Sequence, residues 1–108
     1  MAVEMWSEKV AVVHLGDDPQ FTDDLATLAA LPKPVSDVVL DFGAVRSVNS
    51  QSISKLISVR EKLGESGARL VLCGISTAVW GMFLLAGVDG LFQFSESVAA
   101  ALASLQIS

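Results

Sequence analysis

The hydroxyl groups best placed for chemistry belong to three serines near the middle of the chain, Ser50, Ser52 and Ser54. They follow an apolar segment that ends at Asp41, and apolar side chains recur at helical spacing after Ser50. The first backbone N–H groups of a helix lack partners within the helix, so a helix start favours negative charge. A serine there can gain that charge by phosphorylation. Ser50 is therefore a candidate phosphorylation site, and a plain helix cap is the alternative interpretation.

The other reactive side chains do not form a catalytic or metal-binding pattern. His14, the only histidine, lies in an alternating strand-like segment, which favours a packed or edge residue over nucleophilic catalysis. Cys73, the only cysteine, lies in an apolar run, so we expect a buried thiol and no internal disulfide. The pairs Asp17-Asp18 and Asp23-Asp24 suit a turn and a helix start better than a metal-binding loop. We expect no catalytic residue, no metal and no cofactor.

Length and charge restrict the classes of function further. The 108 residues, 52% of them hydrophobic, suit one domain over residues 1–108 with a single core. The net charge of −5 disfavours binding to nucleic acid, which needs clustered Lys and Arg. No apolar stretch reaches the roughly 18 residues needed to span a membrane, and the first residues lack the pattern of a secretory signal. We therefore expect a cytoplasmic protein that binds another protein, without membrane insertion.

Apolar segments separated by Gly, Pro and polar residues predict alternating strands and helices. The expected strands are Val3–Trp6, Lys9–Leu15, Val38–Phe42, Leu70–Cys73 and Leu91–Phe94. The expected helices run from a cap at Thr22 to the stop signal Pro32-Lys33-Pro34, over Ser50–Leu63, from a cap at Ser76 to Ala86, and from a cap at Ser95 to Leu105. Strands joined by helices form right-handed βαβ units. The predicted fold is α/β, with a mixed, mostly parallel sheet of four to five strands packed with about four helices.

The residues around Ser50 resemble the STAS domain of anti-sigma factor antagonists. In that family an apolar strand leads through a loop to an Asp-Ser-(Ser/Thr)-Gly-(Leu/Ile) motif at a helix start. The matching residues here are Asn49-Ser50-Gln51-Ser52, so Asn49 replaces the acidic residue and Ser52 replaces the glycine. The similarity spans roughly residues 10–105 and includes segment 67–76, Val79, Phe83 and Gly87-Val88. The resemblance implies a STAS-like single domain in which Ser50 is the serine that family kinases phosphorylate.

The same resemblance implies a non-enzymatic role in partner switching. The unphosphorylated domain would bind an anti-sigma factor that is a serine kinase, releasing a sigma factor, and phosphate on Ser50 would end the binding. Asn49 is neutral and cannot act as a base, so either another kinase acts on the chain or the switch has been lost. Two alternatives are an accessory subunit that binds the ATPase of an ABC transporter and a small-ligand sensor that uses the loops at the strand carboxyl ends. A hydrolase using Ser50 is the least favoured.

The helix expected at residues 76–86 is apolar nearly all round. Val79, Met82, Phe83 and Ala86 suffice for its buried side. Trp80 and Leu84 then share a neighbouring face, which either widens the core or binds a partner. The predicted partner-binding residues are Asn49, Ser50, Gln51, Ser52, Ser54, Trp80 and Leu84, and a homodimer is a second possible use of this surface.

Overall fold

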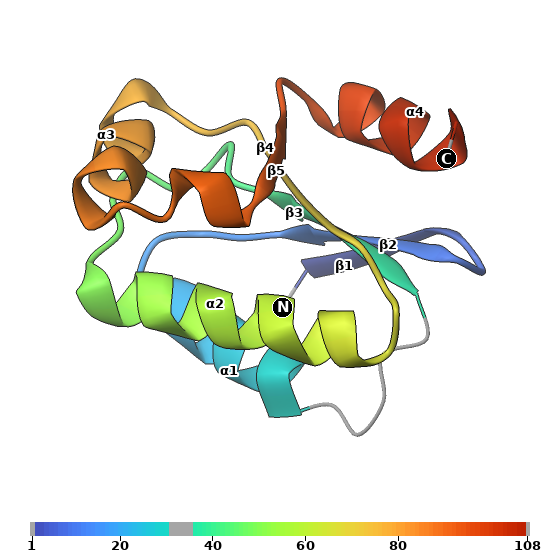
Figure 1. Ribbon diagram of the computed structural model, residues 1–108, viewed down its shortest axis with the longest axis horizontal. Coiled ribbons are helices and arrows are strands. Elements are labelled where there is room, and N and C mark those ends of the chain that lie inside the picture. The colour runs from blue at the N-terminus through green and yellow to red at the C-terminus, as the bar shows by residue number, and fades with distance from the viewer. Residues whose placement is uncertain (1, 31–35, 108) are drawn as a thin grey trace.

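The computed structural model describes residues 2–30 and 36–107, and the elements follow the predicted order (Figure 1). These ranges form, in chain order, β1 (Ala2–Ser7), β2 (Val10–His14), α1 (Gln20–Ala30), β3 (Asp37–Asp41), α2 (Ser50–Glu65), β4 (Leu70–Cys73), α3 (Thr77–Ala86), the 3-10 turn η1 (Asp89–Leu91), β5 (Gln93–Ser95) and α4 (Val98–Ile107). The expected helix stop at Pro32-Lys33-Pro34 lies outside the described residues. None of the helices in the described ranges combines the length and apolar character that crossing a membrane requires.

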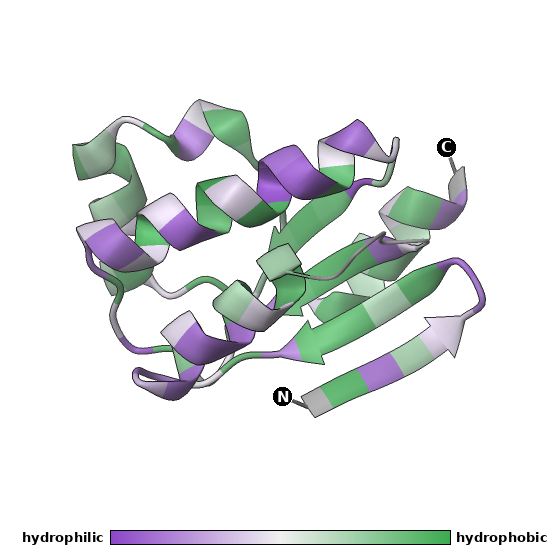
Figure 2. Cartoon of the chain, turned by 90° about the horizontal axis from the view of Figure 1, so that it is seen from below, coloured by the Kyte–Doolittle hydropathy of each residue, from purple (hydrophilic) through white to green (hydrophobic). Residues whose placement is uncertain are grey.

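A single five-stranded sheet runs through the domain in the order β1-β2-β3-β4-β5. β1 is antiparallel to β2, whereas the other neighbouring strands are parallel. β2, β3 and β4 are nearly continuous apolar runs, as expected of strands that are covered on both faces. The edge strand β1 is instead exposed at residues 3–7 and contains both hydrophobic and hydrophilic residues (Figure 2). The predicted α/β fold with a mixed, mostly parallel sheet is confirmed.

Helices cover both faces of the sheet, so successive strand residues enter two separate cores. α1 and α2 lie on one face, and α4 lies on the other (Figure 1). In β3, Leu40 packs in the core that contains Leu25 of α1 and Leu56 of α2. Its neighbour Val39 packs in the smaller core that contains Leu102 of α4. This alternation follows from the two-residue period of a strand, because successive side chains point to opposite faces of the sheet.

Helix α3 lies beyond the carboxyl ends of the parallel strands, at the same end of the domain as the start of α2 (Figure 1). Val79 and Phe83 are fully buried, as predicted. The prediction that Met82 and Ala86 also face inward is wrong, because both are exposed. Since α3 is apolar on all sides, no period in its sequence marks the buried face.

Two of the three expected helix caps are formed by other residues. The amide N–H and the hydroxyl of Thr22 donate to the Asp18 carboxylate, at 2.9 and 2.6 Å, so Thr22 lies inside α1 and Asp18 holds its first turn. Ser95 belongs to β5, and the Ser97 hydroxyl accepts the N–H of Ala100 at the start of α4. Ser76 caps α3 as predicted. Asp and Ser are similarly good caps, so a local run of them leaves the choice open.

Candidate functional site: the amino end of α2

Three apolar side chains hold the loop that leads from β3 into α2. Phe42, Val45 and Val48 are buried, and the N–H of Phe42 donates to the carbonyl of Cys73 at 2.9 Å. The loop is therefore anchored on the core immediately before the helix begins. Ser50 follows as the first helical residue and is exposed.

Asn49, rather than Ser50, caps the helix. The Asn49 side-chain oxygen accepts the N–H of Ser52 at 2.9 Å, and the Ser52 hydroxyl faces the backbone N–H of Asn49 at 3.4 Å. The two residues form a reciprocal capping box. The alternative interpretation of Ser50 as the cap is therefore wrong. Within residues 2–30 and 36–107 the Ser50 hydroxyl has no hydrogen-bond partner.

Ser52 supports this helix start from inside. Its side chain is 1% exposed, and its hydroxyl lies 3.0 Å from the Asn49 side-chain oxygen and 3.5 Å from a carboxylate oxygen of Asp18. The prediction that Ser52 contacts a partner is corrected by this burial. In the folded domain, Ser52 links the α2 cap to the loop between β2 and α1.

A shallow hollow of about 310 Å³ lies beside Ser50. It is lined by Thr22, Ser50, Gln51, Ser54 and Lys55. The sequence placed Gln51 and Ser54 in this surface but gave no reason to include Thr22 or Lys55. Thr22 reaches the hollow because α1 packs alongside α2, a tertiary contact without a local signal. The lining side chains carry hydroxyl, amide and ammonium groups, while their carbon atoms form most of the exposed surface of the hollow.

The acidic pair Asp17 and Asp18, in the loop between β2 and α1, contacts the loop that leads to α2 and the start of α2 itself. The Asp17 carboxylate accepts the backbone N–H of Arg46 at 2.7 Å, and the Arg46 guanidinium lies 3.9 Å from the same carboxylate. Asp18 contacts Thr22 and Ser52 as described above. Among the residues that the structure describes, no group of three or more His, Cys, Asp and Glu side chains could hold a metal ion.

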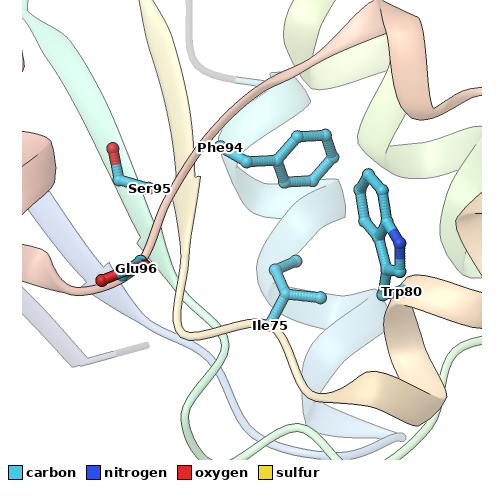
Figure 3. Close-up of a pocket in the computed structure, with 5 residues that line it drawn as sticks. All are labelled: Ile75, Trp80, Phe94, Ser95 and Glu96. Carbon is cyan, nitrogen blue, oxygen red and sulfur yellow. The ribbon is translucent and has the colours of Figure 1, made fainter.

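Trp80 and Leu84 lie on a different part of the surface. Trp80 is 37% exposed and its ring packs edge-on against Phe94, with 5.0 Å between centroids. In Figure 3 the two rings point toward each other beside Ile75, whereas Ser95 and Glu96 leave the chain on the other side. These five residues line a groove of about 390 Å³.

The structure does not bring Trp80 into the hollow beside Ser50, because the two depressions share no lining residue. It does reveal additional apolar surface around α3. Leu84 is 50% exposed and Leu85 is 85% exposed, and Met82 and Leu91 are also exposed. Leu85 was missed by the sequence analysis, since an apolar residue in an apolar helix carries no mark of exposure.

His14 and Cys73 lie at the carboxyl ends of β2 and β4, and neither of them lines the Ser50 hollow. The imidazole of His14 contacts Asp41 and Glu4, so it is tied to two carboxylates rather than to a nucleophile. Cys73 is buried; burial, and then the neighbouring charge of Asp41, raises the pKa of its thiol to about 11. At neutral pH the thiol is therefore protonated and unreactive.

The sequence pattern of one domain family matches residues 3–101, which is almost the whole chain. That family is the STAS domain. The chain belongs to the STAS domain family. The predicted family is thus confirmed. No curated protein sequence matches the chain.

Several solved structures share this STAS fold. The anti-sigma factor antagonist SpoIIAA in its unphosphorylated form is 15% identical, with a TM-score of 0.80 over 99% of this chain and 96% of that one. SpoIIAA, a Bacillus cell fate determinant, in its phosphorylated form is 14% identical, with a TM-score of 0.68 over 96% of this chain and 97% of that one. A sulfate transporter family protein from Wolinella succinogenes is 17% identical, with a TM-score of 0.75 over 96% of this chain and 90% of that one. At these identities the similarity establishes the fold.

Proposed function

We propose that this STAS domain is a non-enzymatic regulatory protein that binds a protein partner at the amino end of α2, under control of phosphorylation at Ser50. The observation that carries the proposal is that adjacent residues at the start of α2 have different roles. Asn49 and Ser52 satisfy the helix cap, which leaves the Ser50 hydroxyl exposed and uncommitted. A kinase can therefore reach Ser50 without unfolding the helix start.

Phosphorylation there would change the surface mainly through charge. A phosphate adds about 1.5 to 2 negative charges at neutral pH. Lys55 is the charged residue in the lining of the hollow, and Asp18 contacts Thr22 at its edge. The added negative charge exceeds the positive charge of Lys55. The phosphate would therefore strongly repel acidic groups on a partner that fits the unmodified surface.

The partner class that fits best is an anti-sigma factor with serine kinase activity in the cytoplasm. SpoIIAA, an anti-sigma factor antagonist of the same fold, has been solved in both unphosphorylated and phosphorylated forms, which supports a switch of this kind. The partner would contact Asn49, Ser50, Gln51 and Ser54, and Trp80 and Leu84 of α3 at the same end of the domain.

Because the side chain of Asn49 is neutral, the base for phosphorylation has to come from the kinase. The Asn49 oxygen already accepts the Ser52 N–H and cannot take a proton from Ser50. The kinase must therefore supply the base itself. Replacing Asn49→Asp keeps a capping side chain and adds a carboxylate, so we expect faster phosphorylation with unchanged helix stability.

Intact-mass analysis after incubation with the partner kinase and ATP tests the proposal. We expect one added phosphate on the wild-type chain and none on Ser50→Ala. Ser54→Ala is the matched control, because Ser54 lines the same hollow one helical turn later, and it should be phosphorylated normally. Phosphate that persists in Ser50→Ala would assign the modification to another residue.

A constitutive binding subunit, such as one attached to the ATPase of an ABC transporter, is the second candidate. Asn49 favours it, because a chain that is never phosphorylated has no need of an acidic neighbour. This candidate predicts a stable partner complex in which Ser50 carries no phosphate and in which Ser50→Ala changes nothing. Isolation of the complex from the native host, with phosphosite mapping, separates the two.

A further inference from the structure

The single histidine of the chain connects the first three strands of the sheet. The Nδ1 atom of His14, on β2, lies 2.7 Å from a carboxylate oxygen of Asp41 at the end of β3. The Nε2 atom lies 3.2 Å from a carboxylate oxygen of Glu4 on the edge strand β1. His14 and Asp41 are register partners, and Glu4 is the diagonal neighbour on the other side. Both ring nitrogens therefore face a carboxylate.

The same bridge reaches the loop that leads to α2. The other carboxylate oxygen of Asp41 accepts the N–H of Gly43 at 2.9 Å. Gly74 packs against this contact so closely that a β-carbon there would lie 3.2 Å from the Asp41 oxygen and 3.3 Å from the Gly43 nitrogen. Asp41 is thus held between His14 and the first turn of the loop.

The charge of the imidazole decides how strongly this bridge holds. A neutral imidazole has one N–H and can donate to one carboxylate, whereas the protonated ring donates to both. The hydrogen bond to Asp41, followed by that to Glu4, raises the pKa of His14 above its ordinary value of 6.5. Cys73, which pairs with Asp41 on the next strand, is neutral at physiological pH. α4, on the same face, carries no titratable side chain over Val98–Ile107.

We propose that Glu4, His14 and Asp41 form a proton-dependent bridge that fastens the edge strand β1 to the sheet and steadies the loop at Gly43. The bridge is complete when the imidazole is protonated and loses one hydrogen bond when the proton leaves. β1 and β2 make no other side-chain hydrogen bond to each other within the described residues, so this contact is the one that pH can remove.

The direction of the pH effect follows from the raised pKa of His14. Because the folded chain binds the proton more tightly than the unfolded chain, the contribution to stability is fully present below pH 6.5. It is lost as the pH rises through the raised value. β1 should therefore open more often in mildly alkaline solution than in mildly acidic solution.

An NMR titration of the imidazole tests the bridge directly, because the chain has one histidine and gives one signal. We expect a pKa above 6.5 in the wild type, a lower pKa in Glu4→Gln, and a lower one again in Asp41→Asn. Glu8→Gln is the control, because Glu8 lies in the turn between β1 and β2 and is exposed. It should leave the pKa unchanged. A wild-type pKa at or below 6.5, or equal values in the wild type and Glu4→Gln, would overturn the proposal.

Amide hydrogen exchange tests the consequence for β1. After correction for the intrinsic exchange rate, protection of the β1–β2 amides should fall at least about threefold between pH 6 and pH 9. The fall should be absent in His14→Gln. Protection that is independent of pH in the wild type would show that the bridge does not hold the strand. Neither experiment involves a partner, so both are independent of phosphorylation at Ser50.

Discussion

The start of α2 and the helix α3 lie at the same end of the domain, but the surface at α2 is polar whereas that of α3 is largely apolar. At α2, polar side chains are fixed by a capping box while one hydroxyl remains exposed. α3 has no charged residue, and its exposed side chains include four large apolar ones, Trp80, Met82, Leu84 and Leu85. A surface of the first kind can be changed by one phosphate, whereas one of the second kind contributes contact area that is insensitive to charge. A partner that covers both would be held by α3 and controlled at α2.

The largest expected effect is on the free energy of unfolding, and it differs between the buried and the exposed face of α3. Phe83 is fully buried and packs against Phe42 and Phe94, so Phe83→Ala should lower the free energy of unfolding by about 3–5 kcal/mol. Leu85→Ala, two residues later on the exposed face, should change it by less than about 0.5 kcal/mol. Urea unfolding of both variants measures the difference. Similar losses would mean that the outer face of α3 is buried in the isolated domain.

The second prediction concerns charge at the α2 surface. Ser50→Asp places a carboxylate where phosphorylation would place a larger charge, and it should weaken partner binding at least about tenfold, or about 1.4 kcal/mol. Ser58→Asp is the control, because Ser58 is also exposed on α2 but lies two turns further along. Titration calorimetry gives both affinities. Equal weakening by the two variants would point to the overall charge of the helix rather than to its start.

The third prediction asks whether α3 supplies binding energy. Trp80→Ala should weaken partner binding by about 1–2 kcal/mol if the indole is an anchor, as large aromatic side chains often are. Trp6→Ala, which removes an exposed indole from β1, should have no effect. Because Trp80 packs on Phe94, unfolding is measured alongside. A folded Trp80→Ala variant with wild-type affinity would remove α3 from the partner surface.

The smallest effect distinguishes the cap from the exposed hydroxyl beside it. Asn49→Ala should lower the free energy of unfolding by about 1 kcal/mol, because the N–H of Ser52 loses its acceptor. Ser50→Ala should change it by less than about 0.5 kcal/mol. If thermal unfolding showed the reverse order, Ser50 would be the structural residue of the pair.

The sheet and most of the helices were predictable because their sequence signals are local and strong. β3 and β4 are short apolar runs bounded by polar residues or glycine, and α2 has a clear helical period. The final strand begins at Gln93 rather than at Leu91, because Leu91 belongs to the 3-10 turn Asp89–Leu91. Apolar character predicts an element more reliably than it predicts where the element begins.

The site was only partly predictable, because its details depend on single residues and tertiary contacts. A helical period could not distinguish Asn49 from Ser50 as the cap, nor show that Ser52 is buried. Thr22 joins the hollow only through the packing of α1 on α2. The bridge at His14 depends on the register of three strands, which alternation within one strand does not reveal.

The most direct measurement compares partner binding by two forms of the domain that differ only at residue 50, one with serine and one with genetically encoded phosphoserine. We predict that the serine form binds and that the phosphoserine form binds at least about tenfold more weakly, while both keep the same fold. Equal affinities of the two folded forms would contradict the central claim that phosphate on Ser50 controls binding.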